Sequence, residues 1–297
     1  MEEHVALYWQ KAGKQDNNLH NHAVECMLCP HNCILKEEQK GICKTRENHK
    51  GTLCTLAWNN PCSICLDPIE KKPLNHFLPG TKTLSIAIAG CNMRCLNCQN
   101  YNISQKSPKE TANYNYTPAA IIELAKKYNT PSISFTYTEP TVYYEYMLAT
   151  AKLAHQNNIK TVIVSNGYIN KKPLQELCNY IDAANIDLKC FDPALHLKLT
   201  GAKLQPVLDS LLLLKRGKIW LEITHLMIPQ YSNNLQTFEK MCQWLVKKGF
   251  DSTPLHINRF FPQNELVHLP ATPVTTIKEA GRIATQAGIK HVYLGNI

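Results

Sequence analysis

The chain from residue 84 onward alternates short apolar runs with longer amphipathic stretches. The apolar runs are rich in β-branched residues and end at turn residues, so they predict β-strands at residues 84–90, 132–138, 160–166, 183–190, 219–228, 255–261 and 291–297. The stretches between them place apolar residues three and four positions apart and predict helices at residues 117–128, 141–156, 172–181, 205–216, 235–248 and 275–288.

Strands that alternate with helices in this way form right-handed βαβ units around a parallel sheet. Six such units predict an α/β fold, a partial TIM-type (β/α)6 barrel, with an open doubly wound sheet as the alternative. The first 80 residues have no clear period and are rich in cysteine and loop residues. We therefore expect a cysteine-rich N-terminal lobe at residues 1–80 and a core barrel at residues 81–297.

The composition is that of a chain that can bury a full hydrophobic core. Hydrophobic residues make up 44% of the 297 positions, no run is long enough to span a membrane, and the first residues show no signal-peptide pattern. We therefore expect a cytoplasmic protein without a membrane partner. The net charge is +9, and the lysines and arginines are scattered along the chain and mixed with acidic residues. This pattern favours a solvated basic surface over attraction to phosphates or an acidic partner.

Cysteines are concentrated in the first third of the chain. Ten of the thirteen precede Gln99, and Cys178, Cys190 and Cys242 stand singly in apolar surroundings. In a reducing cytosol, clustered thiols are more often metal ligands than disulfides, whereas isolated ones behave as small hydrophobic residues. The clusters are therefore the candidate metal sites.

Polar and ionisable residues recur where the predicted strands end. They are Cys91, Cys95 and Cys98 after the first strand, Glu139 after the second, Ser165 and Asn166 after the third, and Asp187 and Lys189 after the fourth. Because the carboxyl ends of parallel strands meet at one rim of a barrel, we expect these side chains to lie together.

Three thiolates in a C-x3-C-x2-C spacing suit an iron–sulfur cluster with one free corner. A four-iron cluster has four corner irons, and sites of the ferredoxin type bind all four through cysteine. Here three cysteines and no obvious fourth leave one iron open, as catalytic metal sites require. The alternative is a zinc site that a distant residue completes.

A second set of cysteines lies in the N-terminal lobe. With two, three and nine residues between its members, the set consists of Cys26, Cys29, Cys33 and Cys43. These spacings suit zinc or a second iron–sulfur cluster. His31 lies among them and is interpreted as a local loop residue. Cys62 and Cys65 form a further C-x2-C pair to which we assign no role.

Several blocks, in one order along the chain, resemble the radical S-adenosylmethionine (SAM) superfamily. The superfamily pattern runs from about Leu84 to the C-terminus. More narrowly, the chain resembles the AmmeMemoRadiSam-system radical SAM enzymes, which are related to pyruvate formate-lyase activating enzymes. The blocks that carry this resemblance are LCPHNC, DPIEKKPLNHFLPG, GCNMRCLNCQNYNISQ, FTYTEPTVYYEYM, VSNGYI, NIDLKCF and INRFFP.

The resemblance assigns roles to the first two strand ends. It implies that Cys91, Cys95 and Cys98 bind three irons of a [4Fe-4S] cluster, and that the amino and carboxylate groups of SAM chelate the fourth. It places Glu139 at the methionine amine, in a Thr-Glu-Pro sequence where the superfamily has Gly-Gly-Glu. The alternative for this residue is an exposed strand-end glutamate. Asn97 departs from the pattern, because the superfamily usually has an aromatic residue there, near the adenine.

The resemblance also assigns the next two strand ends to SAM. Ser165 and Asn166 match the segment that contacts the ribose or carboxylate of SAM, with a simple turn as the alternative. Asp187 and Lys189 match the DLK sequence of the activating enzymes, in which the lysine lies near the methionine carboxylate. We interpret this pair as both catalytic and cofactor-binding, with a buried structural ion pair as the alternative.

The implied activity is reductive cleavage of SAM to methionine and a 5′-deoxyadenosyl radical, which abstracts hydrogen from a small-molecule or protein substrate. His225, His256 and Arg259 are candidates to line the substrate side, or else structural residues. We expect an electron donor such as flavodoxin or ferredoxin. The family name suggests Memo-type and AMMECR-type proteins as partners.

Two other functions stay open at this point. One is an activase that installs a glycyl radical on a partner enzyme. The other is a non-catalytic zinc protein that binds nucleic acid through its cysteine-rich lobe, although we do not expect a nucleic-acid partner. Family members often continue past the YLGNI block with a further cysteine-containing segment, and we expect no site in this chain that needs ligands from it.

Overall fold

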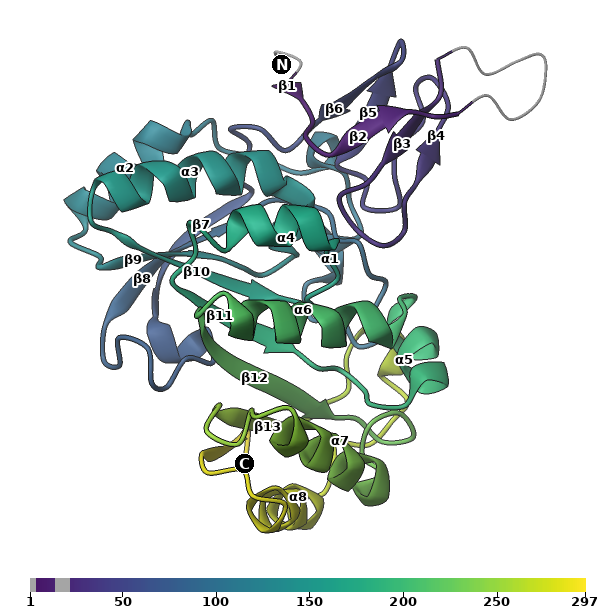
Figure 1. The fold of residues 1–297 in the computed structure, drawn as a ribbon, viewed down its shortest axis with the longest axis vertical. Helices are drawn as coiled ribbons and strands as arrows, with labels where there is room; N and C mark the ends of the chain where they lie inside the picture. Colours follow the sequence, from purple (N-terminus) through teal and green to yellow (C-terminus); the bar gives the residue numbers. More distant parts are fainter. Residues whose placement is uncertain (1–3, 14–21) are drawn as a thin grey trace.

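The structure is a computed structural model that describes residues 4–13 and 22–297 (Figure 1). Residues 1–3 and 14–21, which belong to the predicted N-terminal lobe, lie outside the described residues. Among those that are described, no helix has the length and apolar character that crossing a bilayer requires.

The core is an eight-stranded sheet in which seven parallel strands follow one another in chain order. The parallel strands are β8 (Lys82–Ala87), β9 (Ser132–Phe135), β10 (Lys160–Ser165), β11 (Ala183–Asp187), β12 (Trp220–Met227), β13 (Leu255–Arg259) and β14 (Val292–Gly295). All seven predicted strands are confirmed. At one edge, β7 (Ser63–Pro68) pairs antiparallel with β8, and β14 forms the other edge. The partial barrel is confirmed, and the doubly wound alternative is wrong because the strand order never reverses.

The predicted helices lie in the connections between these strands, where Figure 1 shows them stacked along one face of the sheet. They are α2 (Pro118–Lys127), α3 (Tyr144–Gln156) with η3 (Pro140–Tyr143) before it, α4 (Lys171–Leu177), α6 (Leu204–Arg216), α7 (Leu235–Lys247) and α8 (Val274–Gln286). The structure adds α1 (Tyr101–Ser104), α5 (Pro193–Thr200) and the short 3-10 turns η1 (Ile69–Lys71), η2 (Pro108–Glu110) and η4 (Asn264–Leu266).

The N-terminal lobe consists of two small antiparallel sheets at one end of the molecule (Figure 1). One contains β1 (His4–Val5), β6 (Thr52–Thr55) and β5 (Arg46–His49), and the other contains β2 (Trp9–Lys11), β3 (Val24–Cys26) and β4 (Ile34–Leu35). The next strand, β7, already belongs to the barrel sheet although it precedes residue 81. The division into two domains stays a prediction.

The two faces of the barrel sheet differ in polarity, because successive residues of a strand point to opposite faces. Ile133 and Phe135 belong to the main apolar core on the helix-covered face. The alternate residues are polar yet buried, and they hydrogen-bond to one another on the inner face. Thr83 Oγ1 and Ser134 Oγ lie 2.7 Å apart, and Thr224 Oγ1 donates to Asn185 Oδ1 at 2.9 Å. The barrel interior is therefore lined by polar groups that in part hydrogen-bond to one another, whereas Ser132 Oγ is buried without a partner among the described residues.

Residues 69–80 cover the amino ends of the strands. Ile69 and Leu74 pack against Val162 and Ala183, which lie near the starts of β10 and β11. The backbone N–H groups of residues 75 and 76 donate to Glu222 on β12, at 2.9 Å and 2.8 Å. This segment closes the end of the barrel opposite the strand ends that carry the cysteine loop.

Glu222 is buried and accepts four hydrogen bonds, so we expect Glu222→Gln to destabilise the fold. Besides the two backbone groups, His256 Nε2 lies 2.7 Å from its carboxylate and Trp220 Nε1 donates at 3.2 Å. Burial raises the pKa of Glu222, but His256 and these N–H groups lower it more. Glutamine offers one oxygen to three obligate donors, the two backbone N–H groups and Trp220 Nε1, and we expect a loss of about 3 kcal/mol in the free energy of unfolding.

Urea denaturation measures this loss as a lower midpoint with an unchanged slope. The stabilisation from Glu222 is present above the usual carboxyl pKa of 4.5 and is lost as the pH falls through the lower pKa of the folded state. Glu123→Gln, on the exposed face of α2, is the control and should change stability by less than about 0.5 kcal/mol. Equal midpoints for the two variants would contradict the role given to Glu222.

Candidate active site

The predicted cluster-binding cysteines lie on the loop that follows β8. The loop begins at Gly90, whose φ of 107° favours glycine. A Cβ at this position would collide with Thr45 and lie 2.6 Å from the backbone oxygen of Cys43, so the N-terminal lobe packs directly on the loop. Farther along, the N–H of Arg94 donates to the carbonyl of Thr200 at 2.8 Å, which ties the loop to the end of α5.

Glu139 joins the ends of β9 and β10. Its side chain is fully buried. One carboxylate oxygen accepts from Thr141 N at 3.0 Å, Thr141 Oγ1 at 2.7 Å and Ser165 Oγ at 2.7 Å. The other accepts from Asn166 N at 2.8 Å, which leaves it room for one more donor. Burial raises the pKa of Glu139, and these hydrogen bonds oppose the rise. The alternative of an exposed glutamate is wrong.

Asn166 connects this carboxylate to the cysteine loop. Its Nδ2 donates to Asn92 Oδ1 at 2.9 Å and lies 3.8 Å from Cys91 Sγ. The side chains of Ser165 and Asn166 also form the hydrogen bonds of a turn, which was the alternative for this segment. Gly167 N donates to Ser165 Oγ at 3.0 Å, and Tyr168 N donates to Asn166 Oδ1 at 2.9 Å. The segment is thus a tight turn that also contacts both neighbouring site segments.

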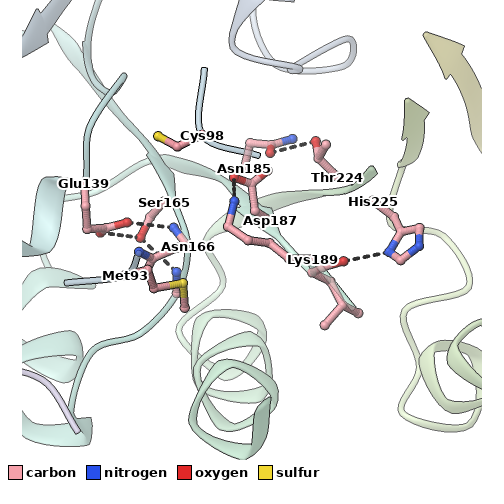
Figure 2. A network of polar contacts seen from close by, with 12 residues as sticks. Met93, Cys98, Glu139, Ser165, Asn166, Asn185, Asp187, Lys189, Thr224 and His225 are labelled. Atoms are coloured by element: carbon pink, nitrogen blue, oxygen red, sulfur yellow. Dashed lines mark hydrogen bonds and ion pairs between the residues drawn. The ribbon is translucent and has the colours of Figure 1, made fainter. Parts of the chain in front are cut away.

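Asp187 and Lys189 form an ion pair at the end of β11, with 2.8 Å between Nζ and Oδ2. Figure 2 shows this pair and the Glu139 hydrogen bonds on neighbouring strands. Burial lowers the pKa of Lys189, but the negative charge of Asp187 and its hydrogen bond to the lysine raise it overall. The lysine is therefore held as a cation beside the cysteine loop. The contact between Asp187 and Lys189 is the one expected of a structural ion pair. The role of these two residues in binding SAM stays a prediction.

Two thiols of the loop, those of Cys91 and Cys95, are held in their protonated form. Burial raises the pKa of Cys91 well above its usual value, and the nearby charges of Glu139 and Cys95 add to the rise. Burial also raises the pKa of Cys95 to about 11, although Lys189 opposes it. Because only thiolates bind metal, a metal centre here would release protons as it forms. Such closely placed buried thiols are stabilised as thiolates when a cation joins them.

The three candidates for the substrate side have structural partners. His225 is buried with its ring nitrogens 2.7 Å from Leu188 O and 3.3 Å from Ser232 O. His256 contacts Glu222, and Arg259 Nε donates to Thr272 O at 2.7 Å. Their hydrogen bonds favour the structural interpretation.

Two residues next to the cysteines have features that the motif alone did not predict. Asn97 Oδ1 is buried and has no hydrogen-bond partner in the part of the chain that the structure describes. Asn92 is buried and bridges two segments, because its Nδ2 donates to Tyr168 O at 2.7 Å and its Oδ1 accepts from Asn166. The sequence offered one signal for these roles: an asparagine directly follows the first cysteine of the motif, and another directly precedes the third.

No single-ion site is preformed among the described residues, since no three His, Cys, Asp or Glu side chains gather in the required geometry. A four-iron cluster binds each cysteine at a different iron, so it takes a wider set of ligands than one ion does.

The chain belongs to the Radical SAM superfamily, whose sequence model matches residues 85–245, more than half of the chain. Members of this superfamily are enzymes that use SAM together with a [4Fe-4S] cluster. The chain is therefore an enzyme, and the alternative of a non-catalytic zinc protein is wrong.

Several known proteins are similar to this chain. The uncharacterized protein MJ0808 of Methanocaldococcus jannaschii is 44% identical over 98% of this chain and 85% of its own length. The 4-hydroxyphenylacetate decarboxylase activating enzyme of Clostridium scatologenes is 24% identical over 54% of this chain, which spans 52% of that enzyme. The structure of Streptococcus suis SuiB bound to SAM has a TM-score of 0.56 at 15% identity, over 72% of this chain and 52% of that one, and shows the shared fold.

We expect Glu139→Gln to cost less stability than Glu222→Gln, although both carboxylates accept four hydrogen bonds. Two of the donors to Glu139 are hydroxyls, which can turn and accept from an amide N–H. The raised pKa also means that the folded state disfavours the charge that the substitution removes. A loss of about 1 kcal/mol is expected in urea denaturation of the metal-free chain. A loss equal to or larger than that of Glu222→Gln would show that the hydroxyls of Thr141 and Ser165 do not turn to accept from the amide.

Proposed function

We propose that this chain is a radical SAM enzyme of the AmmeMemoRadiSam type. It cleaves SAM reductively, and the resulting 5′-deoxyadenosyl radical abstracts hydrogen from a small-molecule or protein substrate. One observation carries the proposal: the cysteine loop, Glu139, Asn166 and Lys189 meet at the carboxyl ends of adjacent strands. Asn166 contacts Cys91, and the charge of Lys189 acts on Cys95. The sequence blocks quoted above support the narrower family.

Cys91, Cys95 and Cys98 would hold the [4Fe-4S] cluster, and their chemistry fits it because buried, closely placed thiols require a cation to ionise. When bound, the cluster and SAM supply the electron transfer that splits SAM into methionine and a 5′-deoxyadenosyl radical. The chain supplies orientation and charge around them. The fold brings one set of SAM-binding candidates to each of three successive strand ends, β9, β10 and β11.

Each candidate has a group suited to one part of SAM. The free acceptor position on Glu139 suits the methionine ammonium, and Lys189 is held as a cation that can pair with the carboxylate. Asp187 keeps Lys189 in place. Ser165 and Asn166 offer hydroxyl and amide groups for the ribose or the carboxylate. The orphan oxygen of Asn97 can accept from the exocyclic amine of adenine, in place of the aromatic contact usual in the superfamily.

The partners follow from the same proposal. The cluster needs an electron donor such as flavodoxin or ferredoxin, and Memo-type and AMMECR-type proteins are the proposed partners. A glycyl-radical activase is the second candidate, favoured by relatives that are named activating enzymes. The two functions differ in their product, since an activase leaves a glycine-centred radical on its partner that EPR detects.

We expect the anaerobically reconstituted protein to form 5′-deoxyadenosine from SAM when dithionite supplies electrons, as measured by liquid chromatography. Cys95→Ala should abolish both the cluster absorbance of the barrel site and the product, because the loop then offers only two thiolates. Cys242→Ala, on the buried face of α7, is the matched control and should keep both. A wild-type protein with intact cluster absorbance and no 5′-deoxyadenosine would defeat the proposed reaction.

Asn97→Ala should weaken SAM binding about five- to tenfold, which is the effect of one lost hydrogen bond from a buried acceptor. Equilibrium dialysis with labelled SAM on the reconstituted protein measures it. Asn102→Ala, on the exposed face of the neighbouring α1, serves as the comparison and should bind SAM like the wild type. If Asn97→Ala also binds SAM like the wild type, the orphan oxygen does not face the adenine.

A further inference from the structure

The four cysteines of the N-terminal lobe line one cavity of about 20 Å³. Cys26 ends β3, Cys29 and Cys33 lie in the loop between β3 and β4, and Cys43 lies in the loop before β5. Three separate turns of the chain therefore bring their cysteines to the same place. The spacing in the sequence predicted this set, and the fold gathers it around a common space.

One of these sulfurs has a cationic donor beside it. The guanidinium of the buried Arg46 donates to Cys26 Sγ at 3.5 Å, and Thr45 Oγ1 lies 3.2 Å from Cys43 Sγ. Donors to the ligand sulfurs are a usual feature of thiolate–metal sites. At Gly41, a Cβ would lie only 3.6 Å from Cys43 Sγ and 3.9 Å from Cys33 Sγ, so the backbone passes close to two of the sulfurs.

The loops that carry these cysteines also form hydrogen bonds with the active-site segments of the barrel. Between Cys29 and Cys33, His31 Nε2 lies 2.8 Å from the carbonyl oxygen of Asn92, the residue after Cys91. The loop carbonyl of Leu28 accepts from Asn170 N at 3.0 Å, and that of Met27 accepts from Asn170 Nδ2 at 2.8 Å. The first cysteine loop therefore contacts both the barrel cysteine loop and the segment after β10.

The loop around Cys43 contacts the remaining strand end. Thr45 Oγ1 donates to the carbonyl of Val142 at 2.8 Å, three residues after Glu139. Arg46 forms a buried ion pair with Glu145 at the start of α3. As described above, Thr45 and Cys43 also abut Gly90. Asn92, Thr141 and Val142 line the four-cysteine cavity itself.

We infer that Cys26, Cys29, Cys33 and Cys43 hold a second, thiolate-bound metal centre, and that this centre positions the three strand ends that bind SAM. The second part rests on the proposed function. The ligand chemistry is that of a soft metal with four cysteines, either zinc or an iron–sulfur cluster. A cluster can bind each thiolate at a different iron, whereas one zinc ion requires the four sulfurs to move inward onto one point.

The metal content of variants tests the site independently of catalysis. In the anaerobically purified full chain, Cys91→Ser, Cys95→Ser and Cys98→Ser together remove the barrel ligands. We expect this triple variant to keep zinc, or iron with acid-labile sulfide, as measured by elemental analysis. Adding Cys29→Ser and Cys43→Ser should remove that metal, whereas adding Cys65→Ser, on exposed β7, should not.

The coupling to the active site is tested with the four cysteines intact. His31→Ala and Asn170→Ala remove contacts between the lobe and the strand ends, and each should weaken SAM binding about tenfold while the metal content stays that of the wild type. Equilibrium dialysis with labelled SAM measures the affinity. Glu37→Ala, at an exposed position of the same lobe, is the control and should keep wild-type affinity.

Two results would overturn the inference. A triple variant without zinc or iron shows that the lobe binds no metal. Wild-type SAM affinity in both His31→Ala and Asn170→Ala shows that the lobe does not position the strand ends. Neither result depends on whether 5′-deoxyadenosine forms, so failure of this inference is distinct from failure of the proposed reaction.

Discussion

The buried carboxylate of Glu139 is the contact on which the arrangement of the site depends. It accepts hydrogen bonds from its own turn and from both residues at the end of β10, so it fixes two adjacent strand ends relative to each other. Burial of an acid is unfavourable unless donors surround it, and these donors are the polar residues of the turns. The strand ends are therefore joined by a polar contact rather than by apolar packing. Asn166 extends that contact to the cysteine loop, and the position of the thiols follows from it.

The other end of the barrel shows the same principle with a different result. Glu222 also collects four donors, but they come from residues 75 and 76, from its own strand and from β13. Its donors lower the pKa, whereas burial dominates at Glu139. One buried carboxylate is thus stabilised as an anion that closes the barrel. The other lies where its charge is disfavoured, and a cationic ligand there would offset that cost.

Much of the barrel could be predicted, because its strands and helices have clear periods and each connection has turn residues. The strand-end position of Glu139 also followed from the order of strands. Other features depend on tertiary contacts. In α5, Leu195, Leu197 and Leu199 alternate with polar residues as in a strand, but Asp192 caps a helix there and Pro193 begins it. His31 was interpreted as a local loop residue, yet it contacts Asn92, 61 positions away. The strands of the lobe have only two to four residues each, too few for a period to show.

The N-terminal lobe is too small to be stabilised by its own apolar packing alone. The six strands described for it are short and form two small sheets, and sheets of this size are only marginally stable unless they pack against another element. Yet its loops contact the backbone of Asn92, Val142 and Asn170, which follow the site residues of the three strand ends by one to four positions. Apolar packing against the barrel core and the ion pair between Arg46 and Glu145 hold these loops in part. Four cysteines around one cavity would add a further connection when a metal binds, because their thiolates join the end of β3 to the two loops that follow it.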